Sequence, residues 1–266
     1  MKNAFYIADY VIIGIDFDGV LAQGYKTKIK YAKKLFNLDL NINQTKRTGF
    51  NNLIKSMGRT DITYDDLIKE IMGKYTLEYE VPKYCKEVLT KLFLENFRFA
   101  VITSRTNEEY PYAKAFIKDN YGKLISNIHN ESSHPNLLNR WRIKFRKKYY
   151  FVKKLKPRIY IDDDIKKLKA LENYPVELFY CRQPENLDKN LGTIDKIRIN
   201  EFSDWKNFYD IAIQLKELHE AICWKYNIIN KFANAIELYN QVHGMTNRQK
   251  QNLIRDYRQQ KTAMAT

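Results

Sequence analysis

Three short apolar runs, each leading into polar residues that carry oxygen atoms, constrain the fold of this chain most strongly. The runs are residues 10–15 (YVIIGI), 97–103 (FRFAVIT) and 158–161 (RIYI). Such runs, rich in β-branched and aromatic residues, are typical of strands that a parallel sheet buries on both faces. Segments with helical spacing separate them, so right-handed crossovers are expected to join the strands. The sequence therefore predicts an α/β fold with a Rossmann-like, mostly parallel sheet.

Polar side chains follow at the carboxyl end of each predicted strand. They are Asp16 and Asp18, Thr103 and Ser104, and Asp162 and Asp163. Ligands of open α/β sheets bind outside these strand ends, which lie together when the strands are neighbours. Carboxylates that gather in one place raise each other's pKa values, and a hard divalent cation relieves the repulsion. Because Mg²⁺ takes carboxylate and phosphate oxygens, the pattern predicts a magnesium site and a phosphorylated substrate.

The rest of the chain divides around this predicted core. Residues 25–81 have helical spacing without a strong strand, and this length exceeds that of an ordinary strand-to-helix loop. We therefore predict a core over residues 1–22 and 82–205, a helical insert over 23–81 and a helical extension over 206–266. Within the core we expect helices over 84–92, 109–121, 139–155 and 165–171, and further strands over 124–128 and 176–180. After Ser203 we expect one helix to about Asn240 and a second over 247–260.

Composition excludes several classes of protein. A hydrophobic content of 44% and a charged content of 29% fit a soluble globular chain. No stretch reaches the roughly 18–20 apolar residues that cross a membrane, so we expect no membrane partner. Cys85, Cys181 and Cys223 are far apart and have no zinc-like pairing with histidine. Their odd number, and an amino-terminal run without a signal-peptide cleavage site, favour a reducing, cytoplasmic setting.

The motifs resemble the signatures of the haloacid dehalogenase superfamily. Residues 16–20 (DFDGV) are similar to the first signature, 101–104 (VITS) to the second and 160–163 (YIDD) to the fourth. The third signature is a lysine on the helix before the last of these strands. Lys148 fits its usual distance best, and Lys144 and Lys147 are alternatives. The resemblance covers roughly residues 8–215, and the helical insert lies where many members carry a cap that selects the substrate.

This resemblance implies a phosphatase with four catalytic residues. Asp16 would attack phosphorus and form an aspartyl-phosphate. Asp18 would protonate the leaving oxygen and then activate water for the second step. Thr103 would hydrogen-bond the phosphoryl oxygens, and Lys148 would neutralise charge on Asp16 and the phosphate.

The same resemblance implies the metal and substrate contacts. Mg²⁺ would be held by Asp16, by Asp18 through its backbone carbonyl, by Asp162 and by Asp163. Ser104, Arg105 and Gly19 are assigned to substrate binding, and Gly19 also allows the tight turn after the first strand.

The basic surplus leaves the type of substrate open. The net charge is +15, and residues 140–158 hold ten lysines and arginines, interleaved with aromatic residues, and no acid. This stretch fits either a nucleic-acid surface or an amphipathic helix whose aromatic residues pack on the sheet. We favour the helix, because the apolar spacing is helical. An enzyme that removes a phosphate from a polynucleotide end is therefore an alternative to one that acts on small molecules.

The insert and the carboxyl-terminal helices each have two interpretations. Lys46, Arg47, Phe50, Asn51 and Asn52 could hold a nucleobase and its phosphate, or form an ordinary helix surface. A helical cap at this place is similar to that of 5′-nucleotidase-like members, which supports a nucleotide substrate by analogy. The apolar stripe after residue 206 either packs on the chain's own body, which we favour, or mediates self-association. The latter would suit a structural or assembly protein that retains the fold.

Overall fold

The sheet has the parallel architecture that the sequence predicts. The computed structural model describes residues 10–125, 127–130, 146–186, 199–226 and 235–265. Within these residues six strands, all parallel, form one sheet in the order β3-β2-β1-β4-β5-β6. The strands are β1 (Val11–Ile15), β2 (Phe97–Thr103), β3 (Asn127–Asn130), β4 (Ile159–Asp162), β5 (Glu177–Cys181) and β6 (Ile199–Phe202). The predicted α/β class is therefore confirmed.

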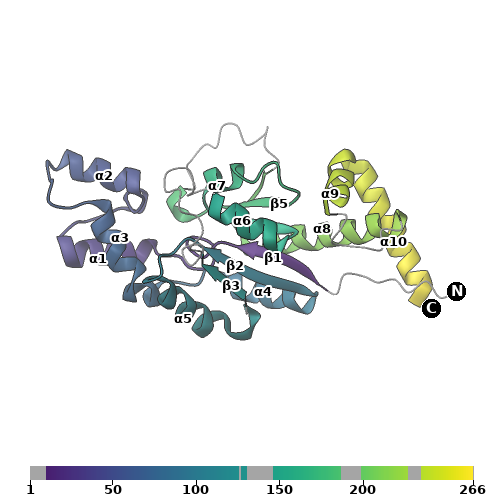
Figure 1. The fold of residues 1–266 in the computed structure, drawn as a ribbon, viewed down its shortest axis with the longest axis horizontal. Helices are drawn as coiled ribbons and strands as arrows, with labels where there is room; N and C mark the ends of the chain where they lie inside the picture. Colours follow the sequence, from purple (N-terminus) through teal and green to yellow (C-terminus); the bar gives the residue numbers. More distant parts are fainter. Residues whose placement is uncertain (1–9, 126, 131–145, 187–198, 227–234, 266) are drawn as a thin grey trace.

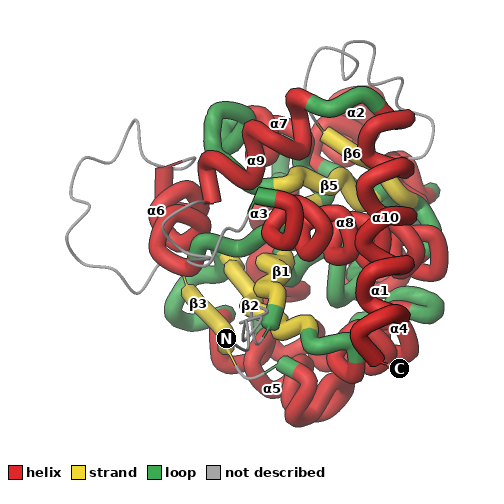
Figure 2. The backbone as a smooth tube through the Cα atoms, turned by 90° about the vertical axis from the view of Figure 1, so that its right-hand side faces the viewer, coloured by secondary structure: helices red, strands yellow, loops and turns green. Residues whose placement is uncertain are grey.

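Helices cover both faces of this sheet, as Figure 2 shows. The helices of the core are α4 (Cys85–Leu94), α5 (Tyr110–Tyr121), α6 (Arg146–Leu155) and α7 (Ile165–Lys169), with short 3₁₀ turns η3 (Gly122–Leu124) and η5 (Pro184–Asn186). Alternate strand residues point to opposite faces. Ile13, Ile15 and Val101 pack with α4 and α5, whereas Ile102 and Tyr160 pack with α6 and α7. The result is a three-layer arrangement of helices, sheet and helices.

Two strands differ from the prediction. β3 begins at Asn127, because Leu124 closes the 3₁₀ turn η3 instead of starting the strand. β6 was not expected at all. Its buried ends, Ile199 and Phe202, enclose the exposed Asn200 and Glu201, so this edge strand lacks the apolar run that marks a central strand.

Between β1 and α4 the described chain is helical. This insert contains α1 (Tyr25–Phe36), η1 (Ile42–Gln44), α2 (Arg47–Ser56), α3 (Tyr64–Met72) and η2 (Lys74–Glu78). It lies at one end of the molecule in Figure 1, beyond the carboxyl ends of the strands. Thr63 caps α3, and its hydroxyl accepts the Asp66 N–H while the Asp66 carboxylate accepts the Thr63 N–H. The two ends of the insert meet in an antiparallel bridge between Gln23 and Glu80, with N–O distances of 2.8 and 3.2 Å.

The carboxyl-terminal helices lie at the opposite end (Figure 1). They are α8 (Trp205–Lys225), α9 (Ala235–Gly244) and α10 (Asn247–Ala265). The expected single helix to about Asn240 is wrong, because α8 ends at Lys225 and α9 packs back against α8. The first half of α8 buries Trp205 and Phe208 in the main core, and the second half forms a small core with α9 and α10. Among the described helices, none is long and apolar enough to cross a membrane.

Candidate active site

The ends of three adjacent strands bring the predicted residues together. Ile15 of β1 is in register with Val101 of β2 and Ile161 of β4. Asp16 directly follows β1, while Thr103 and Asp162 are the last residues of β2 and β4. All three side chains are buried. Neighbouring parallel strands thus account for the convergence on which the sequence argument depended.

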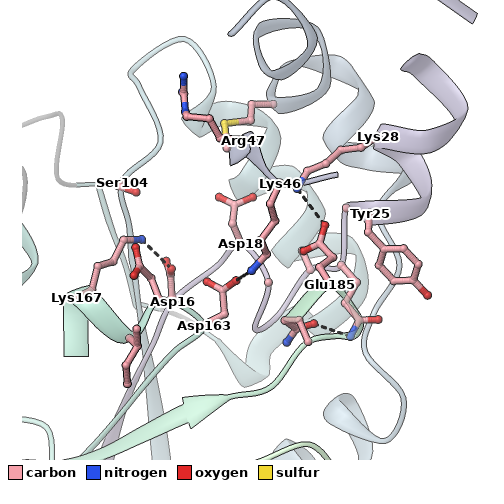
Figure 3. Close-up of a pocket in the computed structure, with 18 of the residues that line it drawn as sticks. Asp16, Asp18, Tyr25, Lys28, Lys46, Arg47, Ser104, Asp163, Lys167 and Glu185 are labelled. Carbon is pink, nitrogen blue, oxygen red and sulfur yellow. Dashed lines mark hydrogen bonds and ion pairs between the residues drawn. The ribbon is translucent and has the colours of Figure 1, made fainter. Parts of the chain in front are cut away.

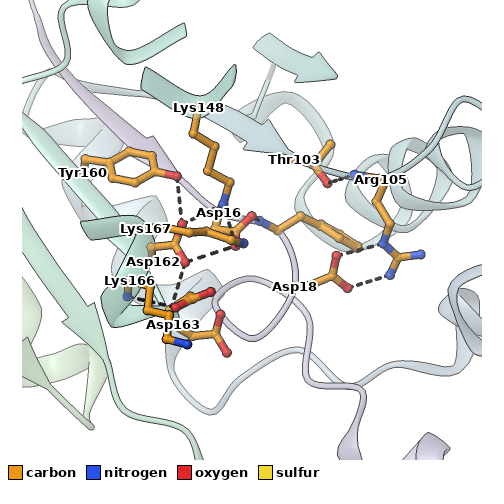
Figure 4. A network of polar contacts seen from close by, with 12 residues as sticks. Asp16, Asp18, Thr103, Arg105, Lys148, Tyr160, Asp162, Asp163, Lys166 and Lys167 are labelled. Atoms are coloured by element: carbon orange, nitrogen blue, oxygen red, sulfur yellow. Dashed lines mark hydrogen bonds and ion pairs between the residues drawn. The ribbon is translucent and has the colours of Figure 1, made fainter. Parts of the chain in front are cut away.

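Lys148 of α6 reaches into this group from above the sheet (Figure 4). Its Nζ lies 2.8 Å from Asp16 Oδ2 and 2.6 Å from Asp162 Oδ2, and the lysine side chain is only 4% exposed. The Tyr160 hydroxyl also donates to Asp162 Oδ2, at 3.0 Å. The two alternatives that the sequence left open, Lys144 and the side chain of Lys147, lie outside the part of the chain that the structure describes.

A second lysine, which the sequence analysis missed, also faces the nucleophile candidate. Lys167 of α7 places its Nζ 3.4 Å from Asp16 Oδ2 and 4.0 Å from Asp162 Oδ1. Burial would lower the pKa of Lys167, but Asp16 and Asp162 raise it overall. Its signal in the sequence is its position one turn after the Asp162–Asp164 run. No motif distinguishes it from the adjacent Lys166.

These cations keep Asp16 ionised although it is buried. Burial alone would raise the pKa of Asp16, but the charges of Lys148 and Lys167 hold it below its usual value. The Phe17 N–H contributes by donating to Asp16 Oδ1 at 2.8 Å. Asp16 is thus a buried carboxylate that stays charged and has lysines on one side.

Three carboxylates form a candidate metal centre. Asp16, Asp162 and Asp163 each offer an oxygen, and these atoms all lie within 4.8 Å of one another. Burial and the neighbouring Asp162 and Asp16 raise the pKa of Asp163 to about 7, although Lys46 opposes this shift. Burial and Asp16 likewise raise the pKa of Asp162. A set of hard oxygen donors that repel one another fits Mg²⁺.

Gly19 allows the loop after β1 to lie against this centre. Its φ is +79°, and a Cβ built on it would lie 2.5 Å from Asp163 Oδ2. Only glycine accommodates both the left-handed backbone and the close carboxylate. Gly19 therefore positions Asp163 in addition to lining the cavity described below.

Asp18 and Arg105 form a separate pair at the edge of the site. Arg105 Nε donates to Asp18 Oδ2 at 2.8 Å, and its Nη2 donates to Oδ1 at 2.6 Å. Figure 4 shows Asp18 turned toward Arg105, away from the group around Asp162. Arg105 was assigned to substrate binding, yet its side chain is 1% exposed and does not line the cavity.

A cavity of about 510 Å³ opens between the insert and the strand ends. Figure 3 shows Asp16, Asp18, Asp163 and Ser104 on the core side, with cations of the insert opposite. Lys46 points at the carboxylates, and its Nζ lies 3.5 Å from Asp163 Oδ2. The remaining polar lining includes Arg47, Tyr25, Tyr64, Tyr79, Lys28, Lys166, Lys167, Tyr180 and Glu185.

The proposed nucleobase contacts of the insert fall into two groups. Lys46 and Arg47 line the cavity, as that interpretation requires. Phe50 does not, because it is fully buried and packs edge-on against Tyr64. Asn51 and Asn52 are exposed and do not line the cavity either. Phe50 therefore belongs to the core of the insert.

Comparison with known proteins supports the fold. No protein-family model and no curated protein matches the sequence. Among solved structures, a protein of Haemophilus somnus described as a predicted phosphoglycolate phosphatase superposes with a TM-score of 0.52 at 16% identity, covering 77% of this chain and 99% of that one. A Bacillus subtilis protein described as a HAD-hydrolase bound to magnesium gives 0.52 at 13% identity, over 76% and 98%. A HAD-superfamily hydrolase of Geobacter sulfurreducens gives 0.50 at 11%, over 76% and 96%.

The chain therefore has the fold of the haloacid dehalogenase-type hydrolases. The strand order and the acidic centre at the ends of β1 and β4 agree with the motifs found in the sequence. The descriptions of these three structures do not name a 5′-nucleotidase, so the comparisons do not support the 5′-nucleotidase-like subfamily.

Proposed function

We propose that the protein is a magnesium-dependent phosphohydrolase that acts through an aspartyl-phosphate on Asp16. The observation that carries this proposal is the setting of Asp16, which is buried at the end of β1 and flanked by two lysines within 3.4 Å whose charges lower its pKa. A nucleophile needs both the charge and fixed cations that stabilise the phosphoryl group in the transition state.

The proposed reaction has two steps. In the first, Asp18 leaves its pair with Arg105 and carries a proton; an Asp16 oxygen forms a bond to phosphorus while the bond to the leaving oxygen breaks, and Asp18 gives that oxygen its proton. In the second, Asp18 takes a proton from water, whose oxygen attacks phosphorus and releases Asp16 and inorganic phosphate. In this proposal Lys148 keeps Asp16 oriented throughout, and Thr103, which is buried at the end of β2, would hydrogen-bond a phosphoryl oxygen. Bound Mg²⁺, held by Asp16, Asp162 and Asp163, would supply a Lewis acid at the phosphoryl oxygens.

The cavity supports a small phosphomonoester as the substrate, with nucleotides the first choice. Lys46 and Arg47 can meet an anionic group, and Tyr25 and Tyr64 offer aromatic surface. A polynucleotide end is the alternative, because the exposed Lys153, Lys154 and Lys156 continue the basic stretch on and just after α6. Phe151 and Val152, which lie in the same basic stretch, pack against Ile102 and Tyr160 of the sheet, as an amphipathic helix requires.

Substitution of Asp16 tests the mechanism. Purified protein with Mg²⁺ should release phosphate from p-nitrophenyl phosphate, and Asp16→Asn should abolish the release by removing the nucleophile. The exposed Asp39→Asn is the matched control and should keep full activity. A chelator should stop the wild-type reaction, and added Mg²⁺ should restore it. Undiminished turnover by Asp16→Asn would refute the nucleophile.

A substrate panel separates the two substrate classes. Nucleoside monophosphates should be hydrolysed faster than a 3′-phosphorylated oligonucleotide of the same base if the cavity selects small esters. The reverse order, with a steep loss of activity as salt rises, would favour the polynucleotide alternative.

A further inference from the structure

Lys167 approaches Asp16 from the cavity, whereas Lys148 approaches it from within the core. The Lys167 Nζ lies 3.4 Å from Asp16 Oδ2 and 4.0 Å from Asp162 Oδ1. The Lys167 side chain is 26% exposed and lines the cavity, while that of Lys148 is only 4% exposed. Figure 3 shows the Lys167 ammonium directed at Asp16 from the wall of the cavity. Of these two lysines, Lys167 is therefore the one that a metal ion or a substrate in the cavity can reach.

The chain between the proposed metal ligands and Lys167 fixes the backbone of this lysine. The Asp164 N–H donates to Asp162 Oδ1 at 2.9 Å, and the Asp164 carboxylate accepts the Lys166 N–H, which caps α7. Leu168 is fully buried and packs α7 against the sheet. Asp162 and Lys167 thus belong to one short hydrogen-bonded unit, and only the flexible lysine stem can change the position of the ammonium.

Lysines already neutralise the carboxylates of the candidate metal centre. Asp16, Asp162 and Asp163 carry at most three negative charges. In the described part of the chain, three ammonium groups lie within 4.0 Å of these carboxylates, those of Lys46, Lys148 and Lys167. Mg²⁺ would add two positive charges, and a phosphoryl dianion would add two negative charges. The charges of the centre therefore cancel when neither or both are bound, but not when Mg²⁺ is bound alone.

We infer that Lys167 is a counter-ion that opposes Mg²⁺ while the cavity holds no phosphoryl group and ceases to oppose it once that group is bound. If Mg²⁺ and the Lys167 ammonium share Asp16, the two cations repel each other where water screens the repulsion only in part. A phosphoryl group that Asp16 can attack lies beside the same ammonium, which can then donate to a phosphoryl oxygen.

Lys167 thereby couples the binding of the metal to the binding of the substrate. By linkage, an anion that tightens Mg²⁺ is itself tightened by Mg²⁺ to the same extent. The inference extends the proposed function and rests on it for the kind of anion that the cavity takes. It concerns binding and not turnover, so it can be tested without hydrolysis.

Equilibrium binding of Mg²⁺ tests the inference. Calorimetric titration of the full chain, with and without saturating inorganic phosphate, gives the factor by which phosphate tightens the metal. Lys167→Met removes the charge and should tighten Mg²⁺ about 10-fold in the absence of phosphate, at the low end of the repulsion between charges a few ångströms apart. With phosphate bound, the variant and the wild type should bind Mg²⁺ about equally. The phosphate effect should thus fall about 10-fold in the variant.

Two further variants isolate the charge at this position. Lys169→Met is the matched control, because Lys169 is an exposed lysine of the same helix that does not line the cavity. It should bind Mg²⁺ as the wild type does in both conditions. Lys167→Arg keeps the charge and should keep the wild-type phosphate effect. In the absence of Mg²⁺, phosphate itself should bind more weakly to Lys167→Met than to Lys169→Met.

Each outcome bears on the inference. Lys167→Met that binds Mg²⁺ no more tightly than the wild type without phosphate would overturn it, as would an undiminished phosphate effect. If circular dichroism shows that Lys167→Met does not fold, Lys167→Gln replaces it under the same criteria. Wild-type protein that binds Mg²⁺ and phosphate as expected but hydrolyses no ester would refute the proposed function and support the inference. Hydrolysis by wild-type protein whose Mg²⁺ affinity is unaffected by phosphate would do the reverse.

Discussion

At the scale of single residues, Gly19 is where backbone geometry and site chemistry are most tightly joined. Its left-handed backbone turns the chain between Asp18 and the insert, and it lies against the Asp163 carboxylate. The same atom position that a Cβ would need is occupied by a proposed metal ligand. Gly19 is thus required by space as well as by backbone angle.

We predict that Gly19→Ala lowers activity through Asp163. The new methyl group would displace the carboxylate, so the Mg²⁺ concentration for half-maximal activity should rise. Gly58→Ala is the control, because Gly58 also has a positive φ, +64°, but no atom lies within 4 Å of its added Cβ. Both variants should lose about 1 kcal/mol of stability from the backbone term. An unchanged Mg²⁺ requirement in Gly19→Ala would contradict the prediction.

The residues that lie together were predictable where strand ends define them. Asp16, Thr103 and Asp162 follow from apolar runs and parallel pairing alone. The partners of Asp18 and the position of Lys167 beside Asp16 were not predictable, because both depend on the direction in which a side chain points. Arg105, which the resemblance assigned to substrate binding, is directed instead at Asp18 and the insert.

At the scale of elements, the seam between the insert and η5 holds a half-buried ion pair. Glu185 of η5 accepts from Lys28 of α1 at 3.2 Å and from Thr45, next to η1, at 2.7 Å. Gln23 adds a contact to Gln183 at 2.9 Å. Burial would lower the pKa of Lys28, but Glu185 raises it. The lysine is therefore charged and depends on this carboxylate.

We predict that Glu185→Gln loosens the insert. Leaving Lys28 charged without its carboxylate should cost roughly 1–3 kcal/mol of unfolding free energy, less than the usual loss for a fully buried pair because both side chains are only partly buried. Glu80→Gln, which breaks the exposed pair with Lys26, is the matched control and should cost less than about 1 kcal/mol. Denaturant unfolding measures the loss, and hydrogen exchange should show it in α1 and η1. Equal costs in the two variants would argue against a structural role for the seam.

The sequence predicted elements well where their pattern was regular and poorly at edges. Central strands with continuous apolar runs were found, and β6 was missed because half of its residues face solvent. The break after Lys225 was missed because the apolar stripe of α8 continues in helical phase through residue 236. Periodicity indicates which face is apolar but not where a helix turns back on itself.

At the scale of the whole molecule, stability is linked to pH through the carboxyl-terminal helices. His219 of α8 is buried close to Arg158, the residue before β4, and to His243 of α9. Burial, together with those two basic groups, lowers the pKa of His219 to about 3. His243 in turn lies 3.0 Å from Glu177 of β5, so these helices are connected to the sheet.

We predict that acid weakens the fold through His219. Its pKa is depressed in the folded state, so the unfolded chain binds the proton first as pH falls below about 6.5, and stability is lost from there downward. Between about pH 7.5 and about pH 5 the His219→Gln variant should lose about 2 kcal/mol less unfolding free energy than the wild type. Urea unfolding at the two pH values measures this difference. The same pH dependence in both proteins would show that His219 does not carry it.

The bridge between Gln23 and Glu80 has a consequence for how such a protein can change its selectivity. Because the insert leaves and re-enters the core through two hydrogen-bonded residues, its ends are neighbours whatever lies between them. Loop closure costs little more for a longer segment than for a shorter one. Another segment with adjoining ends could therefore replace the insert between Gln23 and Glu80 while Asp16 and its lysines stay in place. Recognition of a substrate by the insert and the chemistry at Asp16 can then evolve separately.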